Sequence, residues 1–456
     1  MSETNKHSLE RGLGFKGLLS LALSDITPMA SLLVTAGAVL VLSGTAGVWA
    51  FSIGCFIAIT VAMSMAELGS MYPTAGGLFY IVNKVLGRPI GFLAMVDYVL
   101  QGVFIPATLA LGLGTYLHSL SPSIPVNASS AIGMAVITLL AVLRIHISAI
   151  IVTICLAIEG IVLALIIGVG LFHWNQPLSI ITNPVMLTDG KLGSVAGAAI
   201  VAAIASSLFS VNGYDSAINF SEEVKGSARS VGRAVLFAAL AGVALELTAF
   251  IFGLFGTKDL TTYLGSSTPF TDSVTNALGS GAGKVVLIGA LFAIVNATLA
   301  ITLQFARVLW ASGRDQAWPT PVNDFLGKVH PKFRSPWIST LLIGGISTIF
   351  CLKSSLISTV TFTAVLIIIL YALIAIAALV SRVKDKNAER PFKMMFWPIP
   401  PIITIVGVGV TLTQQKTSDL KIIAMIIVVS LAYYYLYLNR SKHAKWVPHN
   451  PALMED

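Results

Sequence analysis

The first apolar segment of the chain contains the stretch Leu21-Ala-Leu-Ser-Asp25-Ile-Thr-Pro28-Met-Ala-Ser31. Pro28 removes a backbone donor and its ring clashes with the preceding turn, so a helix through this stretch is kinked or broken. Asp25, Thr27 and Ser31 place polar atoms around the same point. The sequence therefore predicts a helix that is interrupted where polar groups gather, in the middle of an otherwise apolar segment.

A second interruption of the same kind lies at Ser206-Ser-Leu-Phe-Ser-Val-Asn-Gly-Tyr-Asp-Ser216. Gly213 lowers the helix propensity, and Asn212 and Asp215 are costly if they face lipid. Two interpretations stay open at this point. Both segments are helices that are only kinked and packed through small residues, or both are discontinuous helices that expose backbone groups.

The composition places both interruptions in a membrane. The 456 residues are 56% apolar and only 11% charged, whereas a soluble domain carries about 25% charged residues. Apolar runs such as Phe362–Val380 and Ile422–Leu438 approach the roughly 20 residues that a membrane-spanning helix needs. The basic residues behind the net charge of +8 lie between such runs, so they predict membrane topology rather than nucleic-acid binding. The expected fold class is an all-α polytopic membrane protein in a lipid bilayer.

We predict twelve transmembrane helices, separated by polar stretches that contain Gly and Pro. Their approximate ranges are 14–42, 47–70, 88–117, 126–143, 147–172, 194–221, 229–256, 283–311, 336–353, 357–381, 399–414 and 419–438. With these boundaries, 22 of the 28 Lys and Arg residues fall on one side, which the positive-inside rule assigns to the cytoplasm. Both tails, 1–13 and 439–456, are therefore expected in the cytoplasm of a cell-membrane protein. Segments 182–193 and 258–281 are expected outside, and no cleaved signal peptide is expected.

The two interruptions stand at matching places in the chain. Each begins a group of five predicted spans, residues 14–172 and 194–381, and a final pair of spans follows at 399–438. An odd number of spans turns the second group over, which predicts a five-plus-five inverted repeat with discontinuous helices 1 and 6. Interrupted spans at corresponding positions of inverted halves indicate a transporter binding site. The freed N–H groups of a broken helix suit a carboxylate, and its freed C=O groups suit an ammonium group.

Three stretches resemble a known family in their order and spacing. They are Ala66–Tyr80 (AELGSMYPTAGGLFY), Phe209–Asp215 with the following Ser221-Glu222-Glu223, and Arg307–Asp315 with the following Val329-His-Pro-Lys332 and Ser335-Pro336. Through them the chain resembles the amino acid–polyamine–organocation superfamily over nearly its whole length. The break at Ile26-Thr-Pro-Met29 is similar to that of bacterial putrescine and amino-acid importers of this superfamily. It departs from the Gly-Ser-Gly break of many amino-acid exchangers.

The resemblance implies alternating access and a small amino acid or amine as substrate. It implies that backbone N–H groups near Met29, Ala30 and Ser31 hold a carboxylate. It also implies that the carbonyl groups of Phe209, Val211 and Asn212 hold an amine. Three residues of the third span share one helix face, which resembles the pocket-lining face of the family: Tyr98, Gln101 and Gly102. The expected substrate site is completed by Asp25, Ile26, Thr27, Ser210 and Asp215.

The charges expected inside the membrane are nearly all acidic, namely Asp25, Glu67, Asp97, Glu159, Asp215 and Glu246. This pattern favours a cationic or neutral substrate over an acidic one. Asp25 either pairs with a substrate amine or cation, or accepts hydrogen bonds from freed N–H groups. Glu159 is in the middle of the fifth span. Some proton-coupled relatives have a lysine at what looks like this position, where it stands in for a sodium ion. A carboxyl group can also carry a proton, so Glu159 is expected either to couple transport to a proton gradient or to be a permanently protonated structural group.

No metal site, cofactor or enzyme centre is expected. Cys55, Cys155 and Cys351 lie far apart in apolar segments, and the seven His residues fall at span ends, in loops or in tails. The favoured function is secondary transport, by proton symport, of an amino acid or a polyamine-like amine. An exchanger without ion coupling and a nutrient receptor that has lost transport remain as alternatives. No obligate protein partner is evident.

Overall fold

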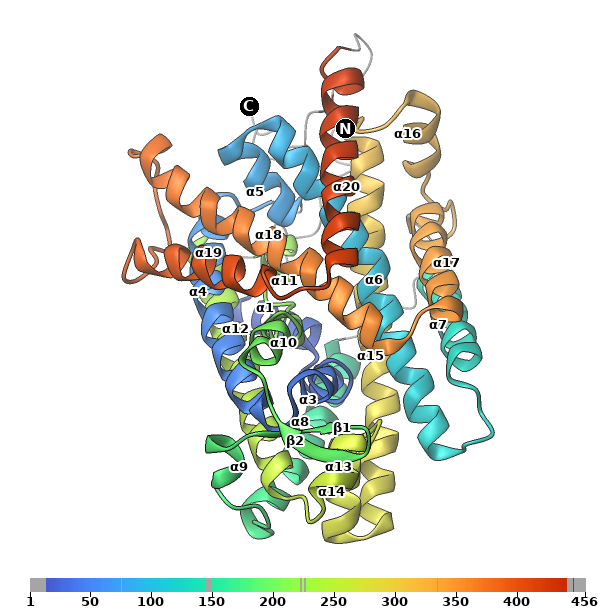
Figure 1. Ribbon diagram of the computed structural model, residues 1–456. Helices are drawn as coiled ribbons and strands as arrows, with labels where there is room; N and C mark the ends of the chain where they lie inside the picture. The colour runs from blue at the N-terminus through green and yellow to red at the C-terminus, as the bar shows by residue number, and fades with distance from the viewer. Residues whose placement is uncertain are drawn as a thin grey trace.

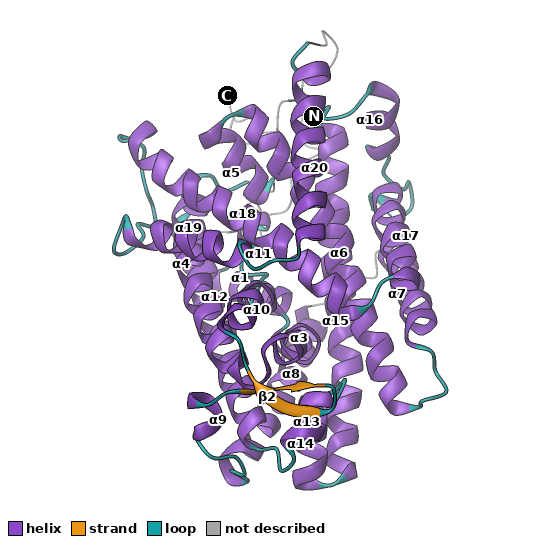
Figure 2. Cartoon of the chain, in the orientation of Figure 1, coloured by secondary structure: helices purple, strands orange, loops and turns teal. Residues whose placement is uncertain are grey.

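The computed structural model describes residues 14–74, 76–143, 149–221, 224, 227–333, 335–440 and 446, and nearly all of this chain is helical (Figure 2). One or more helical segments lie over each of the twelve ranges predicted as spans. In the first half these are α1 (Phe15–Ile26), α2 (Pro28–Ala30), the π-helical η2 (Ser31–Ala36), α3 (Gly37–Ser43), α4 (Gly47–Met71), α6 (Arg88–Leu120), α7 (Val126–Val142) and α8 (Ala149–Phe172). In the second half they are α10 (Gly197–Ser210), α11 (Ser216–Asn219), α12 (Arg229–Phe255), α15 (Ser280–Arg314), α17 (Trp337–Lys353), α18 (Leu356–Lys384), α19 (Ile399–Leu412), α20 (Thr417–Tyr433) and η5 (Tyr434–Leu438).

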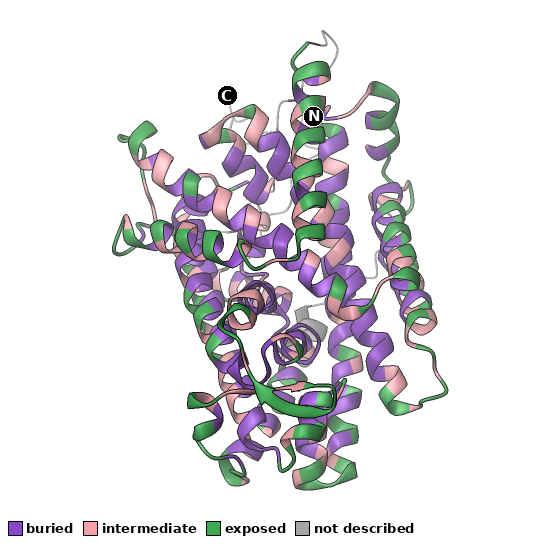
Figure 3. Cartoon of the chain, viewed as in Figure 1, coloured by how far each residue is buried: buried purple, intermediate pink, exposed green. Residues whose placement is uncertain are grey.

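Seven helical stretches of the described chain are long and apolar enough to cross a membrane. They are Phe15–Met71, Arg88–Leu120, Cys155–Phe172, Arg229–Phe255, Ser280–Arg314, Leu356–Lys384 and Thr417–Leu438. Outward faces of the bundle are exposed (Figure 3) and carry large apolar side chains, among them Phe56, Phe172, Phe292 and Val428. Soluble proteins rarely expose apolar surface on this scale. The chain is therefore a polytopic helical membrane protein.

The short connecting elements gather at two opposite ends of the molecule (Figure 1). Helices α5 (Gly77–Leu86) and α16 (Thr320–Leu326) lie at one end. Helices α9 (Ser179–Thr182), α13 (Leu260–Gly265) and α14 (Pro269–Leu278) lie at the other end, together with a β-hairpin. The distribution of Lys and Arg predicts the same two groups.

Segment 182–193, expected to be a loop, mostly forms this hairpin. Strand β1 (Val185–Thr188) pairs antiparallel with β2 (Lys191–Ser194), and Val185 stands opposite Ser194. Asp189 and Gly190 both have positive φ, 50° and 75°, which is the pattern of a two-residue type I′ hairpin turn. The Asp-Gly pair is the sequence signal that the prediction passed over.

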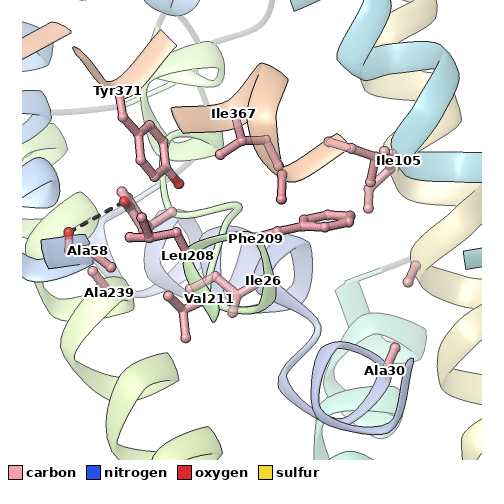
Figure 4. Close-up of a cluster of buried hydrophobic side chains, with 14 of the residues drawn as sticks. Ile26, Ala30, Ala58, Ile105, Leu208, Phe209, Val211, Ala239, Ile367 and Tyr371 are labelled. Atoms are coloured by element: carbon pink, nitrogen blue, oxygen red, sulfur yellow. Dashed lines mark hydrogen bonds between the residues drawn. The ribbon is translucent and has the colours of Figure 1, made fainter. Parts of the chain in front are cut away.

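The pieces of the first and sixth spans lie inside the bundle. Helix α10 packs against α3, α4 and α18, and α1 packs against α12. Figure 4 shows the apolar side of the sixth-span break, where the Phe209 ring points toward Ile105 of α6. The dashed line in the same view marks the hydrogen bond of 3.4 Å that Tyr214 Oη donates to the carbonyl of Ala58. The unwound segment is therefore held by neighbouring helices on several sides.

Candidate functional site

The first span is broken at Thr27. This residue ends α1 and precedes α2 with φ 45° and ψ 63°, a left-handed conformation that is rare for a β-branched residue. Pro28 then starts α2 at a position where its missing N–H is not needed. Ser31 Oγ donates a hydrogen bond of 2.8 Å to the carbonyl of Ile26, one of the groups that the break leaves without a helical partner. The strain at Thr27 is thus accompanied by local compensation from Ser31.

The sixth span is broken from Val211 to Asp215, between α10 and α11. Gly213 has φ 120°, which L side chains rarely adopt. A Cβ atom added to Gly213 would lie 2.7 Å from the carbonyl carbon and oxygen of Asp25 and from the Ile26 nitrogen. The backbones of the two breaks therefore touch each other, and only glycine permits this approach.

A small cavity of about 30 Å³ lies where the breaks meet. This volume is on the order of that of one water molecule, so the lining side chains must move apart to admit an amino acid or amine. The described lining residues include no Lys or Arg. They are Asp25, Ile26, Thr27, Ser31, Thr35, Tyr98, Gln101, Ile105, Leu109, Phe209, Asn212, Gly213, Asp215, Ile301, Gln304 and Phe305.

A chain of hydrogen bonds joins the two acidic residues of this cavity. The partners of Gln304 orient its amide nitrogen toward Asp25, to which it donates at 3.0 Å to each carboxyl oxygen, while its carbonyl accepts from Asn219 Nδ2 at 2.8 Å. Asn219 Nδ2 also donates to Tyr98 Oη at 2.9 Å, and Tyr98 Oη donates to Asp215 Oδ2 at 2.9 Å. The network connects α1, α15, α11, α6 and the sixth-span break, so a charge that enters the cavity acts on all of them.

The third span contributes a wall that is itself supported from behind. Gln101 Nε2 donates to Asp97 Oδ2 at 2.8 Å, and both side chains are buried. The ring of Tyr98 packs edge-on against Phe305, with centroids 4.9 Å apart. Gly102 lies under the same Phe305 side chain, since an added Cβ would come within 2.5 Å of Phe305 Cβ. The predicted helix face is therefore present. Gly102 packs against the Phe305 side chain and does not line the cavity.

Nine of the predicted site residues line the cavity, and the others lie behind it. The nine are Asp25, Ile26, Thr27, Ser31, Tyr98, Gln101, Phe209, Asn212 and Asp215. Behind it, the Met29 N–H points to Glu159 Oε2 at 3.4 Å, and Ser210 Oγ donates to Glu246 Oε2 at 2.6 Å. Ala30, Gly102 and Val211 are buried without lining it.

The sequence analysis predicted the eighth span but missed its contribution to the cavity. Ile301, Gln304 and Phe305 stand at i, i+3 and i+4, so they share one face of α15, and all three line the cavity. Asn219 of α11 was also missed, although it connects Gln304 to Tyr98. The signal was an uncharged amide within an apolar span, and attention to charged residues alone passed over it.

These features define a class: a polytopic helical membrane protein whose two broken helices meet at a buried, acidic cavity. The model of the amino acid permease family matches residues 13–436, and the chain belongs to this family. It is accordingly a transporter-type protein rather than an enzyme.

Three relatives illustrate the range of the family. The serine/threonine exchanger SteT of Bacillus subtilis is 25% identical over 454 residues, which cover 96% of this chain and 99% of SteT. The low-affinity putrescine importer PlaP of Escherichia coli is 26% identical over 91% of both chains. The branched-chain amino acid permease BcaP of Bacillus subtilis is 23% identical over 97% of this chain and 96% of BcaP.

Proposed function

We propose that this chain is a secondary active transporter that imports an amino acid or amine across the cell membrane by alternating access, coupled to protons. The observation that carries the proposal is the contact of two broken helices at a buried cavity with Asp25 and Asp215, among whose described lining residues there is no base. The names of the relatives, which include amino acid and putrescine transporters, support the same substrate class.

The proposal includes the topology. Twelve spans form a five-plus-five inverted repeat, 14–172 and 194–381, with a final pair at 399–438 and both tails in the cytoplasm. Helices over all twelve ranges, and the separation of the connecting elements into two ends, support it. Alkaline phosphatase fused after Gly190 should be active, and the same fusion after residue 456 should be inactive. Activity at both positions would contradict this topology.

For the substrate, we propose that an amine binds between Asp25 and Asp215, with the carbonyl groups of Phe209, Val211 and Asn212 as further acceptors. A carboxylate would bind at the N–H groups of Met29, Ala30 and Ser31. The cavity is shaped by Ile26, Thr27, Tyr98 and Gln101, while Gly102 and Ser210 support it from behind. Because the Met29 N–H faces Glu159 here, a substrate carboxylate and an ionised Glu159 compete for the same donor.

Glu159 is the proposed proton-coupling group. Glu159 is 2% exposed, and its hydrogen-bond partner among the described residues is the Met29 N–H. Gaining or losing a proton at Glu159 therefore changes a contact of the first-span break itself. This proximity links proton occupancy to the shape of the substrate site.

Thermal-shift measurements on the purified protein test the substrate assignment. L-serine, L-leucine, putrescine and L-glutamate are compared, since a ligand stabilises the state that it binds. We expect a shift with a cationic or neutral compound, and a shift with L-glutamate alone would contradict the proposal. Asp25→Asn should abolish the shift by an amine, whereas Asp324→Asn, on the exposed side of α16, should leave it unchanged.

The alternative is exchange without ion coupling, and the name of the relative SteT supports it. Proteoliposomes with and without an inward proton gradient distinguish the two. Symport predicts accumulation that follows the gradient. Uptake that ignores the gradient and requires internal substrate would establish the exchanger.

A further inference from the structure

Two buried carboxyl groups stand behind the cavity, one against each break. Glu159 of α8 accepts from the Met29 N–H, at the start of α2, at 3.4 Å. Glu246 of α12 accepts from Ser210 Oγ, at the end of α10, at 2.6 Å. The two side chains are 2% and 0% exposed, and Oε1 of each has no hydrogen-bond partner among the described residues.

The two carboxyl groups stand on neighbouring helices around the first-span break. Helix α8 packs along α12, α2 contacts both helices, and Glu159 lies within electrostatic range of Glu246. The other titratable groups that face them are thiols, Cys155 beside Glu159 and Cys55 of α4 beside Glu246. Neither glutamate forms an ion pair with a described Lys, Arg or His residue.

Two neighbouring carboxylates without a base are unfavourable in a medium of low dielectric constant. A single proton relieves this repulsion, because it removes one of the two negative charges. The unpartnered Oε1 atoms of Glu159 and Glu246 are the available positions for such a proton.

We propose that Glu159 and Glu246 form one proton site, in which Glu246 is the second carboxyl group and each glutamate contacts a different broken helix. The inference rests on the proposed proton coupling and adds a residue to it. A proton taken from one side of the membrane removes one of the two negative charges of the pair, and when it is on Glu159 it weakens the hydrogen bond that Met29 N–H donates. The freed N–H then accepts a substrate carboxylate, and the proton leaves to the other side with the substrate.

Glu246→Gln tests this site in proteoliposomes, with whichever of L-serine, L-leucine and putrescine gives the largest thermal shift as the probe. One pH unit supports about a tenfold accumulation ratio per coupled proton. We expect the wild type to accumulate the probe inside the proteoliposomes when an inward proton gradient is imposed. Glu246→Gln should lose this accumulation and keep counterflow exchange, while the exposed Asp324→Asn should accumulate the probe as the wild type does.

The outcomes separate the two proposals. A wild type that ignores the gradient overturns proton coupling as a whole. A wild type that responds, with a Glu246→Gln variant that responds equally, overturns the paired site and leaves Glu159 as a single coupling group.

If Glu246→Gln loses counterflow as well, a second measurement tests the paired site. Proton uptake on binding of the same probe is followed with a pH dye in weakly buffered detergent. Uptake should disappear in Glu246→Gln and in Glu159→Gln, and unchanged uptake in Glu246→Gln overturns the inference. If neither glutamine variant folds, Ser210→Ala provides the readout. It removes the hydroxyl donor to Glu246 and should shift the pH midpoint of proton uptake, and an unshifted midpoint contradicts the pair.

Discussion

Glu67 and the pair Glu159–Glu246 are all buried carboxyl groups, yet their surroundings are opposite. Glu67 accepts four charge-assisted or backbone hydrogen bonds, from Arg382 Nε and Nη2 at 2.8 and 2.6 Å, Arg390 Nη1 at 2.8 Å and Met394 N at 2.8 Å. Among the described residues, each member of the pair accepts one hydrogen bond and neither has a basic side chain beside it. Burial alone therefore does not determine what a carboxyl group does here.

The difference follows position along the helices. Glu67 lies near the end of α4, and its two arginines come from α18 and from the connection to α19, so the cluster joins segments distant in sequence. Tyr72, just after α4, adds a hydrogen bond of 2.9 Å to Asp385 Oδ2. Burial raises the pKa of Tyr72 to about 12, which keeps the phenol a donor. The Glu67 cluster thus contains two ion pairs, whereas Glu159 and Glu246 have no described cation beside them.

Replacing Glu67 should have the largest effect on stability. Glu67→Ala leaves Arg382 and Arg390 without their anion, and removing one partner of a buried ion pair costs about 3–5 kcal/mol. We expect the free energy of unfolding in detergent to fall by this amount. Asp419→Ala, which removes a partly exposed acid from the first turn of α20, should cost less than about 1 kcal/mol. Equal losses in the two variants would show that the Glu67 cluster contributes no special stability.

Gly213→Ala tests the contact between the two helix breaks. Glu159 and Glu246 each contact one of these breaks. The new Cβ would meet the Asp25 backbone at 2.7 Å, and alanine is strained at φ 120°. We expect a loss of about 2–3 kcal/mol in stability, together with loss of the ligand-induced thermal shift. Gly345→Ala in α17, where nothing lies within 4 Å, should be neutral or stabilising by up to about 1 kcal/mol. A normal ligand shift in Gly213→Ala would contradict the close approach of the breaks.

The sequence was informative wherever a residue type has few uses inside a membrane. Pro28 and Gly213 located both breaks, and the acidic side chains of Asp25 and Asp215 located most of the cavity lining. The positions of the helices also followed from apolar segments and their polar ends.

What the sequence could not provide were contacts between distant segments. Gln304 and Asn219 gain their meaning only when α15 and α11 come together, and nothing local distinguishes them from other polar residues in spans. Glu246 was recognised as a buried acid, but its proximity to Glu159 depends on the packing of α8 against α12. In the same way, the ion pairs of Glu67 could not be predicted, because its arginines lie more than 300 residues away in sequence.

Glu246→Gln should leave the stability of the protein almost unchanged, unlike Glu67→Ala. A glutamine keeps an acceptor for Ser210 and leaves no cation unpaired, so the free energy of unfolding should change by less than about 1 kcal/mol. This is the opposite of the expectation for Glu67, although both side chains are fully buried. Chemical unfolding of the two variants in the same detergent at pH 7 is the measurement. A loss of several kcal/mol in Glu246→Gln would mean that the pair is a structural element like the Glu67 cluster.

Asp272 of α14, outside the predicted spans, is an intermediate case with the smallest expected effect. Burial raises the pKa of its carboxyl group, although a hydrogen bond from Ser266 Oγ partly lowers it. The folded state therefore holds more protons than the unfolded state just above the usual Asp pKa, and stability falls as pH rises through this window. Since the side chain is only partly buried, the contribution should stay below about 1 kcal/mol.

Asp272→Asn removes this titration, so thermal unfolding at pH 4.5 and pH 7 should show a smaller loss of stability with rising pH in the variant than in the wild type. Asp189→Asn, at the exposed hairpin turn, should leave the wild-type difference intact. A wild type that gains more stability than Asp272→Asn over the same interval would reverse the sign. The hydroxyl group of Ser266 alone would then suffice to stabilise a partly buried carboxylate in this protein.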